Sequence, residues 1–176
     1  MRTLLLYLLI LIPLHVTAQM LTTPLDAMKK NYENASKISE IKVSLSDEQI
    51  KNIQQSAHAK LELQNIKLFK AEKDGKVIGH GILINKKIRT KNGVVLYIIS
   101  NESILKGIEV IAFNEPSEYM PSKKYSEQFK NVKTTQPLTL NQNIPTITGA
   151  TMSAKCFVDG SRVAFALYNE FFKGKN

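Results

Sequence analysis

Four strand-like segments follow one another between residues 65 and 113, and no connection between them is long enough to hold a crossover helix. Asp74-Gly75, which separates the first two segments, is a dipeptide typical of tight hairpin turns. Because parallel neighbours would need crossover connections of about a dozen residues or more, the spacing predicts an antiparallel meander. The segments are NIKLFKAE (65–72), KVIGHGILI (76–84), VVLYIIS (94–100) and GIEVIAF (107–113).

Helical patterns lie on both sides of these strands. Two short ones precede them, at 24–35 and 46–59, and the second has Ser46 and Gln49 at capping-box spacing. A third short helix is predicted at 121–131, and the longest pattern, at 153–173, has apolar residues recurring close to the helical period. We therefore expect an α+β fold, in which an antiparallel twisted sheet of four to six strands packs against a long C-terminal helix and shorter helices.

The N-terminus has the three parts of a secretory signal peptide. Arg2 is followed by the apolar run LLLYLLILIPL (4–14), and small residues stand at Val16 and Ala18. A membrane-spanning helix needs about 20 apolar residues, so a cleaved signal is favoured over a retained anchor. We expect cleavage after Ala18 and an exported protein, either periplasmic or on the extracytoplasmic face of a membrane. The expected division is a signal peptide (1–18), an N-terminal helical segment (19–59) and a main domain (60–176).

Charge and cysteine content narrow the function classes. The formal net charge is +9, but the lysines are scattered, and the densest stretch, NKKIRTK (85–91), reads as a hairpin turn. Nucleic-acid binding is therefore disfavoured. The single cysteine, Cys156, lies in the apolar pattern of the last helix and is expected to be a small buried hydrophobe. No His-x-x-x-His or Cys-x-x-Cys spacing points to a metal site.

The segment TITGATMS (146–153) places several hydroxyl groups around a Gly-Ala pair, directly before the last helix. The amides of a first helical turn have no partners within the helix, and the helix dipole is positive there, so a phosphate beside Thr151 would be stabilised. From the residues alone, a simpler interpretation stays open. Thr151 or Ser153 would then only cap the helix.

Thr148-Gly149-Ala150-Thr151 resembles the Ser/Thr-Gly-Ala-Thr motif of the FMN-binding domain family, which includes covalently flavinylated subunits of Na+-pumping quinone reductases and related electron-transport complexes. The similarity extends to GKVIGHGILI (75–84), to the strand, Glu-Pro loop and helix of 107–131, and to SRVAFALYNEFF (161–172). It covers about residues 60–172, most of the chain after the expected signal.

The resemblance implies that FMN is joined by a phosphoester bond to Thr151, installed outside the cytoplasm by a flavin transferase. It implies an electron carrier or redox-complex subunit rather than a stand-alone enzyme, with redox proteins or a membrane electron-transport complex as partners. The flavin ring is expected against the Glu115–Tyr119 loop. The expected cofactor-binding residues are Thr151, Thr148, Gly149, Ala150, Ser153, Glu115, Pro116 and Tyr119.

Two positions depart from the family pattern. Pro145 stands where the motif usually has an acidic residue, three positions before the Ser/Thr, and Ser117-Glu118 replaces the usual glycine after the Glu-Pro loop. Two alternatives to a covalent flavoprotein therefore remain. One is a module of the same fold that binds FMN without a covalent bond, and the other is an exported interaction protein with no cofactor.

Overall fold

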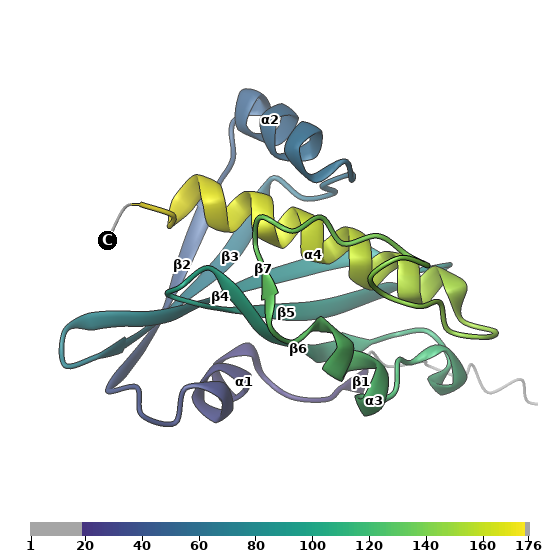
Figure 1. Ribbon diagram of the computed structural model, residues 1–176, viewed down its shortest axis with the longest axis horizontal. Helices are drawn as coiled ribbons and strands as arrows, with labels where there is room; N and C mark the ends of the chain where they lie inside the picture. Colours follow the sequence, from purple (N-terminus) through teal and green to yellow (C-terminus); the bar gives the residue numbers. More distant parts are fainter. Residues whose placement is uncertain (1–18, 175–176) are drawn as a thin grey trace, which may run out of the picture.

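A computed structural model of the chain describes residues 19–174, so the expected signal peptide at 1–18 lies outside the described residues. Its centre is a twisted antiparallel sheet, and the predicted meander is confirmed as four consecutive strands, β3 to β6 (Figure 1). The strand order is β1 (Gln19–Met20), β6 (Ile104–Phe113), β5 (Asn92–Ser100), β4 (Lys76–Lys87), β3 (Asn65–Lys73) and β2 (Lys37–Ser44), and β7 (Val132–Lys133) also pairs with β6.

The described α-helices begin where the sequence supplies capping side chains, with one exception. Thr23 caps α1 (Pro24–Asn31), Ser46 and Gln49 form the predicted capping box of α2 (Asp47–Ala57), and Ser122 caps α3 (Lys123–Ser126). Each of these side chains accepts a hydrogen bond from an otherwise unpaired amide of the first turn. The exception is the long C-terminal helix α4 (Thr151–Phe171), which has no side-chain cap.

The prediction that residues 19–59 form a helical segment is wrong in one important respect. Strand β2 lies between α1 and α2 and pairs with β3 along its whole length, from Lys37 opposite Glu72 to Ser44 opposite Asn65. The strand was missed because its lysines and serines give it the polarity of a connecting loop. Pairing with β3 makes this segment part of the same sheet as the strands that follow it.

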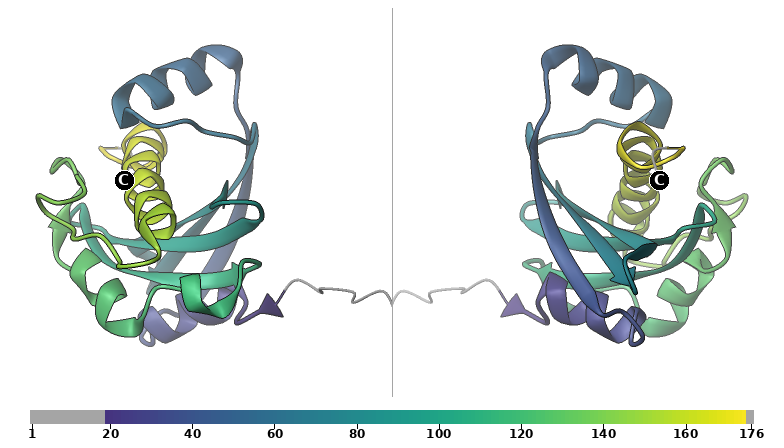
Figure 2. Two further views of the ribbon diagram at one scale, coloured as in Figure 1. Left: turned by 90° about the vertical axis from the view of Figure 1, so that its right-hand side faces the viewer. Right: turned by 90° about the vertical axis from the view of Figure 1, so that its left-hand side faces the viewer.

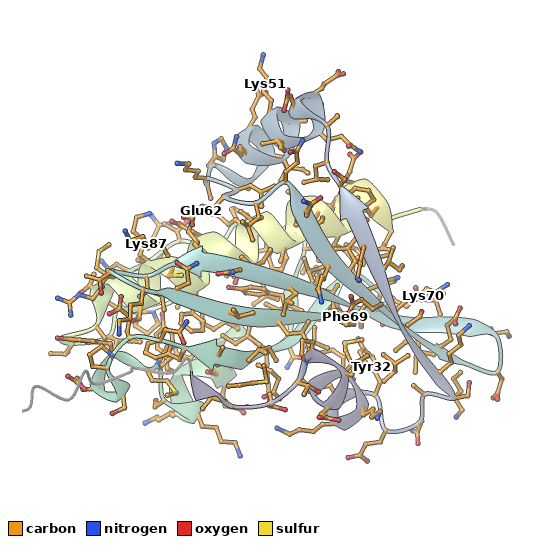
Figure 3. The ribbon with its side chains drawn as sticks, turned by 180° about the vertical axis from the view of Figure 1, so that it is seen from behind. Tyr32, Lys51, Glu62, Phe69, Lys70 and Lys87 are labelled. Carbon is orange, nitrogen blue, oxygen red and sulfur yellow. The ribbon has the colours of Figure 1, made fainter. Side chains whose placement is uncertain are left out.

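Helices cover both faces of the sheet (Figure 2). Val95, Tyr97 and Ile99 of β5 belong to the hydrophobic cluster that includes α4 and α2, whereas Leu96 and Ile98 belong to a second cluster with α1. Figure 3, which views the molecule from behind, labels Tyr32 beside α1 and Phe69 on the sheet, and both belong to this second cluster. Burial on both faces explains why VVLYIIS is a continuous apolar run rather than an alternating one.

Helix α4 approaches β5 very closely at Gly160. A Cβ atom at this position would lie 2.2 Å from the hydroxyl oxygen of Tyr97, which itself donates a 3.0 Å hydrogen bond to the carbonyl oxygen of Phe157. A glycine in the middle of a helix costs about 1 kcal/mol relative to alanine, and here the close approach requires it. Cys156, one turn earlier, is buried as predicted, and burial raises its pKa to about 12.

Between residues 19 and 174, no helix is both long and apolar enough to cross a lipid bilayer.

Candidate functional site

The Thr-Gly-Ala-Thr motif forms a tight turn that leads into α4. The amide of Ala150 donates a 2.9 Å hydrogen bond to the carbonyl oxygen of Ile147, and Gly149, the third residue of this turn, has a φ of 76°. A positive φ at the third position is typical of a type II turn and favours glycine. No atom lies within 4 Å of the position that a Cβ would take, so the backbone conformation, rather than lack of space, is the reason for glycine here.

Thr151 is the first residue of α4, and its side chain is exposed. The N-cap position is held by Ala150, and no side chain bonds to the amides of the first turn. The interpretation that Thr151 or Ser153 caps the helix is therefore wrong. Because the first-turn amides have no partner within the helix and the dipole is positive at this end, the helix start favours an anionic group next to the Thr151 hydroxyl.

Ser153 lies at the third position of the same turn and has the opposite environment. Its side chain is fully buried, and its Oγ has no hydrogen-bond partner among the described residues. Met152, between the two hydroxyl residues, is 49% exposed. The start of α4 thus combines an exposed hydroxyl, an exposed thioether and an unpaired buried hydroxyl within three residues.

Glu115 has a structural task in the turn between β4 and β5. Its Oε1 accepts hydrogen bonds from the amides of Arg89, Thr90 and Lys91, at 3.0, 2.6 and 2.8 Å. These bonds, above all the one from the Lys91 amide, lower the pKa of the Glu115 carboxyl. The carboxylate is therefore occupied in holding the turn.

The turn held by Glu115 presents Arg89 to Tyr119. The guanidinium carbon of Arg89 lies 4.2 Å from the centre of the Tyr119 ring, a distance typical of a cation–π contact. Tyr119 is half-buried in the short 3₁₀ helix η1 (Ser117–Tyr119), and Pro116 before it is exposed. Sequence reasoning identified Tyr119 but not Arg89, because only the folded turn brings the guanidinium onto the ring.

The expected site residues therefore form two groups. Thr148, Gly149, Ala150, Thr151 and Ser153 lie together in the turn and the first turn of α4, whereas Glu115, Pro116 and Tyr119 lie together beside the β4–β5 turn. Both groups lie at the same end of the sheet (Figures 1 and 2). Ile147 and Tyr119 also contact the same hydrophobic cluster. In the described part of the chain, no hydrogen bond joins one group directly to the other.

No protein-family model matches this chain, and no curated protein is significantly similar to it in sequence. Conclusions about its function therefore depend on its own residues and their arrangement.

Proposed function

We propose that this protein is an exported FMN-bearing electron carrier, with the cofactor phosphate esterified to Oγ of Thr151. The observation that carries the proposal is the exposed Thr151 hydroxyl at the uncapped start of α4. A helix N-terminus without a capping side chain leaves amides available to phosphate oxygens, and a hydroxyl at its first position can form the ester.

The residues around Thr151 fit a bound phosphate. Gly149 has no side chain to shield the helix start, and the left-handed turn at this residue directs the chain into α4. Ser153 has a hydroxyl without a partner in the same turn of helix. Because this hydroxyl is fully buried whereas Thr151 is exposed, it would bond a phosphate on Thr151 only after the Ser153 side chain turns outward.

The second group supplies a surface for the flavin ring. Tyr119 has a flat aromatic side chain, and Arg89 places a permanent positive charge 4.2 Å from the centre of that ring. Bound FMN would exchange one or two electrons, and the protein would contribute position and electrostatics. A cation held near the flavin ring favours the reduced flavin, which carries more negative charge. We therefore expect Arg89 to raise the reduction potential of bound FMN.

The remaining parts of the proposal come from the sequence. The signal-like residues 1–18 support export, and the resemblance described above supports a flavin transferase as the modifying partner. Redox proteins, including a membrane electron-transport complex, would exchange electrons with the carrier. The net charge of +9 would favour acidic partners or an anionic membrane surface.

The decisive test is co-expression of the full chain with a flavin transferase, followed by intact-mass and absorbance measurements. We expect one added FMN less one water, and its loss in Thr151→Ala. Thr146→Ala is the matched control, since Thr146 is also an exposed threonine just outside the motif and should leave the modification intact. An unmodified wild-type mass under these conditions would refute covalent attachment.

A second candidate is the same flavin site without the covalent bond. The observation in its favour is Pro145, which stands in place of the acidic residue of the family motif. A yellow protein that releases all of its colour on denaturation would support it. A colourless protein without affinity for FMN would exclude both candidates and favour a cofactor-free interaction module.

A further inference from the structure

A second candidate site lies on the other half of α4, at least about 16 Å along the helix from Thr151 at 1.5 Å per residue. It is a cavity of about 430 Å³ between the end of α2, the segment 134–137 and the outer face of α4. Figure 1 shows α2 across α4 in this region, with the chain after β7 running beside both. The volume is within the range usual for small-molecule sites.

The residues around this cavity include an unusual share of the buried polar atoms that lack partners. Of nine such atoms in the described residues, three belong to residues that line it: Oγ1 of Thr134, Nε of Arg162 and Oδ1 of Asn169. The Thr134 side chain belongs to a residue that is only 5% exposed. An unpaired buried polar group costs about 1–3 kcal/mol, so three beside one cavity favour a state in which their side chains turn toward a partner bound there.

The chemistry of the three atoms selects the kind of partner. Arg162 can only donate, the Asn169 oxygen can only accept, and the Thr134 hydroxyl can do both. An ionised carboxylate, which only accepts, would leave the Asn169 oxygen unpaired. A hydroxyl group both donates and accepts, so a ligand with several hydroxyl groups can satisfy all three atoms.

The guanidinium at the cavity already has a carboxylate partner. Nη2 of Arg162 bonds to Oδ1 of Asp159, whose other oxygen lies 2.6 Å from the Lys155 ammonium. An anionic ligand would have to compete with this buried carboxylate for the guanidinium. The cavity also has apolar wall residues that suit the C–H face of a sugar ring, namely Ala57, Pro137, Phe165 and Ala166.

We propose that this cavity binds a neutral, polyhydroxylated small molecule, such as a monosaccharide or a single sugar unit of a glycan. Thr134, Arg162 and Asn169 would bond to its hydroxyl groups after small side-chain rotations toward the cavity. The proposal is independent of the flavin, because the cavity and Thr151 are separated along α4. Thr151→Ala should therefore bind the same ligand.

The test is a titration of the ¹⁵N-labelled protein, expressed as the full chain, with glucose, N-acetylglucosamine and myo-inositol in separate experiments. We expect at least one of these probes to shift the amide signals of 134–137 and 162–169 with millimolar affinity. Thr134→Val and Asn169→Leu should each weaken that binding about tenfold, the loss expected for one hydrogen bond. Asn85→Leu, which removes an unpaired amide oxygen away from the cavity, should bind normally.

The free energy of unfolding of the Thr134→Val protein without ligand distinguishes a ligand-binding role of the Thr134 hydroxyl from a purely structural one. If Thr134 is kept for a ligand, Thr134→Val should leave the free energy of unfolding unchanged or slightly higher, since it removes an unsatisfied buried hydroxyl. A clear loss of stability without ligand would instead assign the hydroxyl a structural partner and overturn the proposal. So would the absence of shifts with all three probes, or shifts produced by acetate or phosphate but by none of the three.

Discussion

Gly160→Ala tests whether the close approach of α4 to β5 is as tight as the structure shows. In an ordinary exposed helix this substitution would stabilise the protein by about 1 kcal/mol. At Gly160 the new methyl group would lie 2.2 Å from the Tyr97 hydroxyl oxygen and 2.9 Å from Cζ of the same ring. Tyr97 is 1% exposed and packed in the core, so its ring has little room to move.

The expected cost follows from three contributions. Insertion of a methyl group into a packed core costs about 1–3 kcal/mol, and loss of the Tyr97 hydrogen bond to Phe157 adds about 1 kcal/mol. The gain in helix propensity offsets about 1 kcal/mol of this sum. We therefore expect Gly160→Ala to lower the free energy of unfolding by about 1–3 kcal/mol, which in a chain of this size is a fall in Tm of roughly 3–10 °C.

Urea and thermal unfolding of the wild type, Gly160→Ala, Tyr97→Phe and the double variant provide the measurement. Removing the Tyr97 hydroxyl takes away the nearest atom, so Gly160→Ala should cost at least about 1 kcal/mol less in the Tyr97→Phe background. A Gly160→Ala protein as stable as the wild type, or equal costs in both backgrounds, would refute the reasoning.

Three further predictions concern substitutions of single residues. Burial lowers the pKa of His80 to about 4, so on acidification the unfolded chain takes up a proton before the folded protein does, near pH 6.5. Between pH 7 and pH 5 the wild type should therefore lose about 2 kcal/mol more stability than His80→Phe, and equal losses in urea unfolding would contradict this. Glu115→Gln should lower the free energy of unfolding by about 1 kcal/mol and speed hydrogen exchange of the Arg89, Thr90 and Lys91 amides above pH 4.5, where the wild-type carboxylate is ionised. Unchanged exchange would show that the charge does not hold the turn. Gly149→Val should cost more stability than Gly149→Asn, because φ is 76° and asparagine tolerates this region better; equal costs in thermal unfolding would contradict the turn geometry.

Local sequence patterns predicted most of the fold, because the signals for it are local. Asp74-Gly75 has φ values of 50° and 77°, as the predicted hairpin turn requires, and Ser46 and Ser122 cap the helices that were expected after them. Strand β2 was missed because most of its eight residues are polar and no turn dipeptide precedes it. It forms a strand because it pairs with β3, a tertiary contact that the local sequence does not reveal.

The candidate site was also predicted only in part from the sequence. The Thr-Gly-Ala-Thr segment could be found from its residues, and the helix start was misplaced by only two residues, at 153 instead of Thr151. The contact between Arg89 and Tyr119 could not be found, since it requires Glu115 to hold a turn 24 to 26 positions away in sequence. The cavity beside α4 depends on three separate segments and has no local sequence signal.

Strand β1 has a consequence for the order in which the protein assembles. Gln19 and Met20 pair with Phe113 and Ala112 of β6, which closes a loop of about 90 residues. In a chain that emerges N-terminus first, from a ribosome or a translocation channel, these two residues must wait for most of the sheet before they can pair. These two residues would therefore stay unpaired while most of the chain emerges, and they would join the sheet edge only after β6 has formed.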